Sequence, residues 1–248
     1  MNMKVIFFFV LSILLASAAW AAEGKMVTYQ VNNADYEGYY VAPAPKAPLV
    51  LLVHDWDGLD DYEIKRSQML ADLGYSVFAV DLFGAGVRPK KIEDRRRLTN
   101  QLYQDRGKMR ALLYGAMNAA RAQGADLDNA VAMGYCFGGA AVLELARSGA
   151  DLKGFVTFHG GLATPQGENY AEAKGKYLIL HGSADTSVTL DDFVNLAKAL
   201  EARGLEHEMI TYSGAPHAFT VFGTDRYRED ADKKSWQRFV AFLAETLR

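Results

Sequence analysis

The sequence predicts a single α/β domain, with a mostly parallel central sheet and helices on both faces. Short apolar runs alternate with helical patterns along the chain, which is the order expected when crossover helices connect parallel strands. Several of these runs, such as residues 49–53, show no polar alternation, as is typical of strands buried on both faces. The 248 residues contain no internal repeat and no linker that would divide the chain into two domains.

The first expected strands, residues 26–31 and 36–41, form a hairpin with Asn32 and Asn33 in its turn. Six further strands are expected at residues 49–53, 76–80, 130–133, 155–158, 177–180 and 208–212. Helices are expected at residues 62–73, 99–123, 138–147 and 190–203, and a last helix carries the apolar stripe Trp236, Phe239, Val240, Leu243 and Leu247. Residues 81–97, which contain two glycines, a proline and a basic run, are expected to be irregular.

The amino-terminal segment, residues 1–21, has the composition of a secretory signal peptide. Lys4 is followed by a short apolar run, and small residues lead to an Ala-Trp-Ala sequence that ends at Ala21. The alternative is an uncleaved membrane anchor, but the run is shorter than the roughly 20 apolar residues of a spanning helix. In a bacterial cell, cleavage would leave residues 22–248 in the periplasm or outside the cell, without stable membrane insertion.

Composition excludes several classes of protein. Half of the residues are hydrophobic and 23% are charged, which excludes a disordered or collagen-like chain. The net charge of −3 removes the counterion-release drive for non-specific nucleic-acid binding, so no nucleic-acid partner is expected. Cys136 is the one cysteine, so there is no intrachain disulfide and no cysteine-rich zinc site. Composition does not indicate an oligomeric state.

The most informative motif lies between an expected strand and an expected helix. Residues 134–139 read Gly-Tyr-Cys-Phe-Gly-Gly, which is the Gly-x-Ser-x-Gly nucleophile elbow with Cys136 in the serine position. The sharp turn needs small residues two positions on either side of the nucleophile, and Gly134 and Gly138 meet this need. The alternative is that Cys136 is a small buried hydrophobic residue at an ordinary strand–helix junction.

The chain order of the elbow folds, nucleophile then acid then histidine, selects partners for Cys136. His217 follows the last expected strand in a loop at its carboxyl end, where ligands bind in open α/β sheets. Asp185 follows the preceding strand and would orient the imidazole of His217. Asp191 and Asp192 compete with Asp185, although both stand at a helix start where acidic residues are common. The other histidines, His54, His159, His181 and His207, are interpreted as structural or supporting groups.

An acyl-transfer site also needs hydrogen-bond donors for the oxyanion of the tetrahedral intermediate. One donor is the backbone N–H of the residue after the nucleophile, Phe137. The second should come from the loop after residues 49–53, and the Trp56 N–H is the candidate there.

Three segments of the chain resemble the dienelactone hydrolase family (carboxymethylenebutenolidases) of the α/β-hydrolase fold. They are residues 134–139, residues 182–185 (Gly-Ser-Ala-Asp) and residues 216–219 (Pro-His-Ala-Phe), and the resemblance extends from about Val27 to the last helix. The resemblance implies a triad of Cys136, Asp185 and His217. It also implies that small cyclic or activated esters are hydrolysed through an acyl-enzyme, without a metal or an organic cofactor.

Two departures from the family pattern bear on the site. Asp55 occupies the position of a family glutamate that supports the nucleophile, and its shorter side chain either does the same or only orders the oxyanion loop. The family arginine just beyond the catalytic histidine is absent, since the next arginine is Arg226. The other family arginine falls among Arg95, Arg96 and Arg97, a run that is otherwise a solvated face. A neutral ester or lactone therefore fits as well as a dienelactone.

The sequence supports hydrolysis of small carboxylic esters or lactones as the first hypothesis. A thiol-dependent acyltransferase or an amide hydrolase could use the same triad. A non-catalytic periplasmic binding protein would keep the fold without the reaction. A redox sensor based on the Cys136 thiol is a further hypothesis, because the expected compartment is oxidising.

Overall fold

The computed structural model describes residues 22–248, which form eight strands and six helices. The expected signal peptide, residues 1–21, lies outside the described residues. None of the helices in the described part of the chain combines the length and the apolar character needed to cross a membrane.

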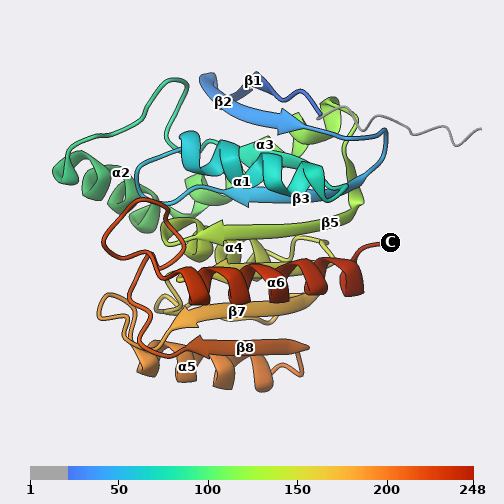
Figure 1. The fold of residues 1–248 in the computed structure, drawn as a ribbon. Coiled ribbons are helices and arrows are strands. Elements are labelled where there is room, and N and C mark those ends of the chain that lie inside the picture. The colour runs from blue at the N-terminus through green and yellow to red at the C-terminus, as the bar shows by residue number, and fades with distance from the viewer. Residues whose placement is uncertain (1–21) are drawn as a thin grey trace, which may run out of the picture.

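All eight expected strands are present in one sheet (Figure 1). Their bounds are β1 Lys25–Val31, β2 Ala34–Val41, β3 Pro48–Val53, β4 Ser76–Val80, β5 Asp126–Tyr135, β6 Gly154–Phe158, β7 Lys176–Gly182 and β8 His207–Tyr212. The order across the sheet is β1-β2-β4-β3-β5-β6-β7-β8. The pairs β1–β2 and β2–β4 are antiparallel and the other five pairs are parallel, so the carboxyl ends of the six strands from β4 to β8 in the sheet order meet at one edge of the sheet.

The central strands are buried on both faces, as their uninterrupted apolar runs predict. The hairpin turn is also confirmed, because Asn32 and Asn33 both have positive φ, as a two-residue type I′ turn requires. Gly74 and Gly124 have positive φ just beyond the ends of their helices, so each helix ends in the left-handed conformation that glycine favours.

The helices are α1 Asp61–Asp72, α2 Ile92–Gln104, α3 Arg106–Ala122, α4 Phe137–Arg147, α5 Leu190–Glu201 and α6 Glu229–Thr246. Two expectations were wrong here. The single helix expected over residues 99–123 is two helices, because Asp105 leaves the helical conformation and its side chain accepts a hydrogen bond from the Lys108 N–H as the N-cap of α3. The segment expected to be irregular over residues 81–97 becomes helical from Ile92.

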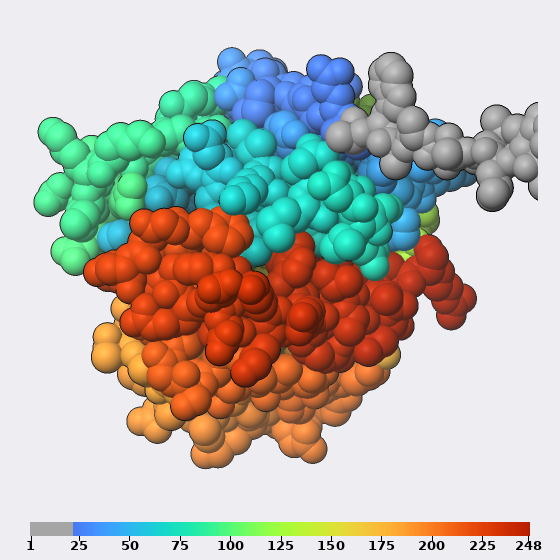
Figure 2. All heavy atoms as spheres, in the orientation of Figure 1, coloured from blue at the N-terminus to red at the C-terminus, as the bar shows by residue number. Residues whose placement is uncertain are grey.

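Two apolar cores separate the sheet from its helix layers. Buried residues of α1 and α6 pack on one face of the sheet, and those of α3, α4 and α5 pack on the other. Figure 2 shows α1 (cyan) and α6 with the loop before it (red) side by side over the first face. Every residue of α4 is buried, so the helix that follows Cys136 is enclosed on all sides.

Ion pairs anchor the carboxyl end of α4. The buried Glu144 carboxylate pairs with Arg147 of its own helix at 2.7 Å and with Arg106 of α3 at 3.4 Å. Arg110 of α3 bridges Glu144 and the half-buried Glu168. Paired charges are the usual way in which ionised groups are tolerated inside a protein, and here they join α3 to the helix behind the elbow.

Candidate active site

Cys136 lies in a strained turn between β5 and α4. Its backbone has φ 50° and ψ −113°, a conformation that residues with a Cβ seldom adopt. The Cys136 N–H donates to the Phe158 carbonyl at 3.1 Å, and the Gly161 N–H donates to the Cys136 carbonyl at 3.1 Å. Hydrogen bonds on both sides of the residue therefore hold the turn that lifts the thiol above the sheet.

The glycines beside Cys136 are required by close backbone packing. A Cβ on Gly134 would overlap the carbonyl of Gly138, and a Cβ on Gly138 would overlap the carbonyls of Val53 and His54. Gly139 lies against the Cα of Gly160, so α4 also approaches the loop after β6 at backbone distance. The Gly-x-Cys-x-Gly-Gly sequence thus permits a turn in which four backbone segments touch.

The structure brings Cys136, His217 and Asp185 into one hydrogen-bonded chain. The Nε2 atom of His217 lies 3.0 Å from the Cys136 Sγ, and its Nδ1 atom lies 2.7 Å from Oδ2 of Asp185. The other oxygen of Asp185 accepts the N–H groups of Ser187 and Val188 at 2.8 and 2.9 Å. Of the competing acids, Asp192 caps α5 through Thr189 and Asp191 is exposed in the first turn of that helix.

The Cys136 thiol and the Asp185 carboxyl group, which end the hydrogen-bonded chain, have different protonation states. Burial would raise the pKa of Asp185, but hydrogen bonds from His217, Val188 and Ser187 outweigh it, and the pKa lies below its ordinary value. Burial raises the pKa of the Cys136 thiol far above its ordinary value, and the charge of Asp55 adds to this effect. The Phe137 N–H opposes the rise. At neutral pH the site therefore combines a protonated thiol with an ionised Asp185.

The loop after β3 is organised by Asp55 and His54. Asp55 is 6% exposed, and its Oδ1 atom accepts the Asp57 N–H at 2.9 Å. Among the described residues its carboxylate makes no hydrogen bond to Cys136. Burial, followed by the neighbouring Asp57, raises the pKa of Asp55 well above its ordinary value. His54 donates from Nδ1 to the Asp55 carbonyl and accepts the Leu82 N–H on Nε2, so its ring supports the loop.

The two expected oxyanion donors come from the start of α4 and from the loop after β3. Phe137 begins α4, and its N–H interacts with the Cys136 side chain. Trp56 lies in the loop after β3 and packs against the same core as Cys136. The guanidinium of Arg95 lies over the Trp56 ring at 5.4 Å and pairs with Asp57 at 3.5 Å. Of the three basic residues Arg95–Arg97, Arg95 is therefore the one placed beside the loop after β3, while Arg96 is exposed and Arg97 pairs with Asp94.

A cavity of about 340 Å³ is lined in part by residues that hydrogen-bond to Cys136 and Asp185. Gly161, which bonds to the Cys136 carbonyl, lines it on one side, and Ser187 and Val188, which bond to Asp185, line it on another. The remaining lining residues are Tyr103, Arg106, Ala140, Arg147, Leu162, Ala163 and Asp192. The sequence reasoning missed Tyr103 and Arg106, because both fell inside an expected long helix with no motif of their own.

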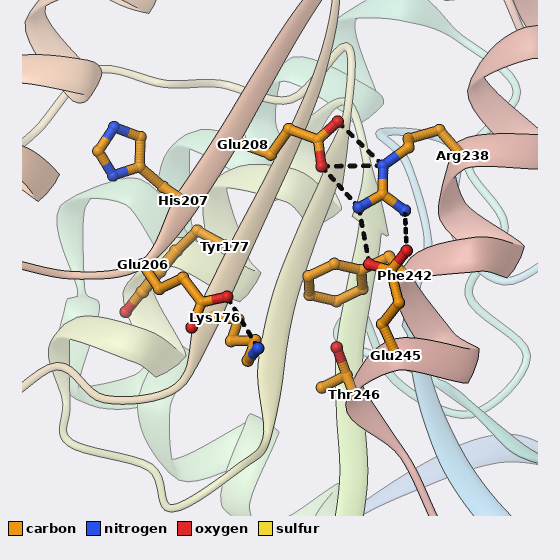
Figure 3. A pocket seen from close by; sticks show the side chains of 9 residues that line it. All are labelled: Lys176, Tyr177, Glu206, His207, Glu208, Arg238, Phe242, Glu245 and Thr246. Carbon is orange, nitrogen blue, oxygen red and sulfur yellow. Dashed lines mark hydrogen bonds and ion pairs between the residues drawn. The ribbon is translucent and has the colours of Figure 1, made fainter.

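A second cavity, of about 220 Å³, lies far from Cys136 at the amino ends of β7 and β8 (Figure 3). Its charged side chains are paired with one another: Lys176 with Glu206, and Arg238 with both Glu208 and Glu245. His207 also lines this cavity, so it lies at the opposite edge of the sheet from Cys136. Over residues 22–248, no group of three or more His, Cys, Asp or Glu side chains is arranged to hold a metal ion.

The dienelactone hydrolase family model matches residues 36–247. The chain belongs to the dienelactone hydrolase family. A Salmonella typhimurium protein with the provisional name carboxymethylenebutenolidase is 26% identical over 225 residues, covering 85% of this chain and 83% of its own. Family membership makes the protein a hydrolase that acts on esters or lactones.

Solved structures agree with the family assignment. The structure named m3DLH has a TM-score of 0.87 and 30% identity, over 92% of this chain and all of its own. The dienelactone hydrolase-like promiscuous phosphotriesterase P91 from metagenomic libraries has a TM-score of 0.85 and 27% identity, over the same shares. A dienelactone hydrolase structure from Klebsiella pneumoniae has a TM-score of 0.81 and 24% identity, over 90% of this chain and 99% of its own. The α/β-hydrolase fold expected from the sequence is confirmed.

The placement of Asp55 yields a test of its effect on the thiol. Asp55→Asn keeps an oxygen that can accept the Asp57 N–H but removes the carboxylate that raises the pKa of Cys136. The thiol pKa should fall, so alkylation by iodoacetamide at pH 7 should accelerate by several-fold up to about tenfold. The measurement is the alkylation rate constant from pH 6 to 10, with the exposed Asp191→Asn as the control. Slower alkylation in Asp55→Asn would instead mean that Asp55 activates the thiol.

Proposed function

We propose that this protein hydrolyses small carboxylic esters or lactones through an acyl-enzyme on Cys136. The observation that carries the proposal is the continuous chain from Sγ through both nitrogens of His217 to the Asp185 carboxylate. A nucleophile within hydrogen-bond distance of a base, itself oriented by a buried acid, is the arrangement that nucleophilic acyl transfer needs.

In the first half-reaction Sγ attacks the carbonyl carbon of the ester while Nε2 of His217 takes the thiol proton. The carbonyl oxygen becomes an oxyanion, which the N–H groups of Phe137 and Trp56 stabilise. When the C–O bond breaks, the imidazolium gives its proton to the leaving alcohol and a thioester remains on Cys136. In the second half-reaction a water loses a proton to His217 and attacks the thioester, which releases the acid and restores the thiol.

The raised pKa of Cys136 agrees with this sequence of steps. A thiol that is protonated at rest needs His217 to remove its proton during attack, so the base works in the transition state. A protonated thiol also reacts slowly with oxidants, because the thiolate is the reactive form. This property suits an exported enzyme, and we propose that residues 1–21 direct the protein to the periplasm or outside the cell.

The cavity beside the triad supplies the substrate site of this proposal. Arg106 lines it, stacks on the Tyr103 ring at 5.1 Å and is the cavity arginine with partial exposure. Arg147 lines the same cavity but is almost fully buried against Glu144. An ester or lactone that carries a carboxylate would place it near Arg106, while Leu162 and Val188 contact its apolar part.

The relative P91 suggests a wider substrate range, since it is described as a promiscuous phosphotriesterase. A phosphotriester would meet the same nucleophile and the same oxyanion donors as a carboxylic ester. A thiol acyltransferase would differ from a hydrolase in passing the acyl group to an added alcohol or amine. A reactant panel should therefore contain an ester, a lactone, an amide and a phosphotriester, each with and without an added alcohol.

Removal of the thiol or of the base tests the mechanism. Cys136→Ala and His217→Ala should each lower kcat/KM for p-nitrophenyl acetate by at least about 10³-fold, because the members of a triad act as a unit. Intact-mass spectrometry of the wild type should show one acetyl group on Cys136, absent from Cys136→Ala. His207→Ala, at the far edge of the sheet, is the matched histidine control. Undiminished hydrolysis by Cys136→Ala would refute the acyl-enzyme, and reversible thiol oxidation without any hydrolysis would favour a redox sensor.

Arg106 should discriminate between acidic and neutral substrates. Arg106→Gln should raise KM for a carboxylate-bearing ester by about 10-fold, while KM for the matching methyl-capped ester changes by less than about twofold. The measurement is the pair of KM values at low and high salt, because a charge contact weakens as salt increases. The exposed Arg96→Gln is the control for the loss of a positive charge. Equal changes in KM for both esters would show that Arg106 does not recognise the substrate carboxylate.

Expression of the full chain in a bacterial host tests export. Cleavage after Ala21 predicts a periplasmic or secreted product whose mass corresponds to residues 22–248. Spheroplast fractionation shows the compartment of the product, and intact-mass measurement of each fraction shows whether residues 1–21 have been removed. Replacing residues 5–11 by a polar sequence of the same length should retain the precursor in the cytoplasm. A membrane-bound product of full-length mass would show an uncleaved anchor instead.

A further inference from the structure

A buried polar network lies beneath the loop that carries His217. We define the Thr220 network as Tyr62 and Arg66 of α1, His159 after β6, Thr220 in the histidine loop, and Asp232 of α6. All five side chains are buried or nearly so, and they come from four separate parts of the chain. The sequence reasoning placed His159 among supporting groups and did not identify the other four.

Thr220 is held by three side chains, at its hydroxyl and at its carbonyl oxygen. Its Oγ1 atom lies 2.8 Å from Nε2 of His159 and 2.7 Å from the Tyr62 hydroxyl. Its carbonyl accepts a hydrogen bond from Arg66 at 2.9 Å, and the same guanidinium group pairs with Asp232. Because Thr220 is three residues after His217, these bonds fix the far end of the turn that presents the imidazole.

The turn between the two residues needs such support. Ala218 has φ 63°, a left-handed conformation that is unfavourable for a residue with a Cβ. A strained backbone persists only where the surrounding contacts determine it. The bonds to Thr220 on one side, and those of His217 to Asp185 and Cys136 on the other, enclose the strained residue.

Arg66 determines the donor at one end of the network. It can only donate, and its Nε–H points to the Tyr62 oxygen at 3.3 Å. The Thr220 hydroxyl lies within hydrogen-bond distance of both the Tyr62 hydroxyl and Nε2 of His159, so it connects the two side chains. The Nδ1 atom of His159 is buried and has no hydrogen-bond partner among the described residues.

His159 in turn contacts the catalytic histidine. The two rings meet edge to face with their centroids 5.4 Å apart. Burial, then the neighbouring His217 and Arg66, lowers the pKa of His159 well below its ordinary value. The titratable groups that face it are His217, His181, Arg66 and the Tyr135 ring at 5.8 Å. A neutral ring in this place allows His217 to become positively charged during the reaction without a like charge against it.

We propose that Thr220 is a positioning residue for His217, and that its hydroxyl, through His159 and Tyr62, holds the imidazole at the Cys136 thiol. Thr220 and His159 touch no substrate and act through His217. This inference rests on the proposed function in that it assigns His217 the role of the base.

The test compares three variants of the histidine loop. Thr220→Val keeps the shape of the side chain and removes its hydroxyl, and Thr220→Ser restores the hydroxyl. Thr224→Val makes the same replacement at an exposed threonine whose hydroxyl only bonds the Val221 carbonyl. Circular dichroism and thermal unfolding of each variant show whether the fold is kept. If Thr220→Val fails to fold, Tyr62→Phe removes one hydrogen-bond partner of the Thr220 hydroxyl while keeping the aromatic ring.

Two readouts separate positioning from a merely structural role. The first is the rate at which iodoacetamide alkylates Cys136 between pH 6 and 10, which reports on the Cys136–His217 pair without any substrate. The second is kcat and KM for p-nitrophenyl acetate. Thr220→Val should slow alkylation at pH 7 by several-fold and lower kcat about tenfold with KM unchanged, with a displaced pH profile in both. Thr220→Ser should recover most of the rate, and Thr224→Val should match the wild type.

The outcomes distinguish this inference from the proposed function. A displaced alkylation profile in Thr220→Val would support positioning even if the wild type hydrolysed no ester, in which case the proposed function would fail alone. Ester hydrolysis by the wild type with identical rates and profiles in Thr220→Val would overturn the positioning role alone. Loss of kcat in proportion to a loss of folded protein, with no change in the pH profile, would also overturn it.

Discussion

The turn at Cys136 is the constraint on which the rest of the site depends. Its positive φ cannot relax, because the amide and the carbonyl of the same residue are both hydrogen-bonded to neighbouring segments. The turn also requires Gly134 and Gly138, where a side chain would collide with backbone. Helix α4, buried along its whole length, then has a single allowed position, and the Phe137 N–H at its start is aimed at the thiol.

Two groups of side chains surround the thiol: the acidic residues after β3, and His217 with its partner Asp185. Asp55 and Asp57, after β3, favour the protonated thiol, and burial acts in the same direction. On the other side, His217 connects the thiol to Asp185, whose charge is stabilised by three hydrogen bonds. The resting thiol is therefore kept neutral, while its base stands next to an ionised acid. In the mechanism that we propose, this arrangement stabilises charge mainly in the transition state, where the imidazolium and the oxyanion form together.

Sequence patterns were informative wherever a local rule controls the structure. Strand-like segments and the Asn32-Asn33 turn identified all eight strands, and the two-residue spacing of glycines around Cys136 identified the turn. Chain order, together with position in the loops after the last two strands, selected His217 and Asp185 as neighbours of the thiol. The break at Asp105 was missed, because one capping side chain outweighs an otherwise continuous helical pattern. Arg66 and Asp232 were missed for a different reason: they pair across 166 residues of chain, and no local pattern marks either one.

The Arg66–Asp232 pair connects the packing of two helices with the loop that carries His217. The ion pair connects α1 to α6 over one face of the sheet. The same guanidinium donates a hydrogen bond to the Thr220 carbonyl in the loop that carries His217. Removing either charge would leave the other buried and unpaired, which commonly costs 3–5 kcal/mol, so a variant there would unfold before it showed a catalytic role. The Thr220 hydroxyl lies further along the same network and carries no charge. Because it can be removed without leaving a buried ion, it separates the positioning of His217 from the attachment of the helices.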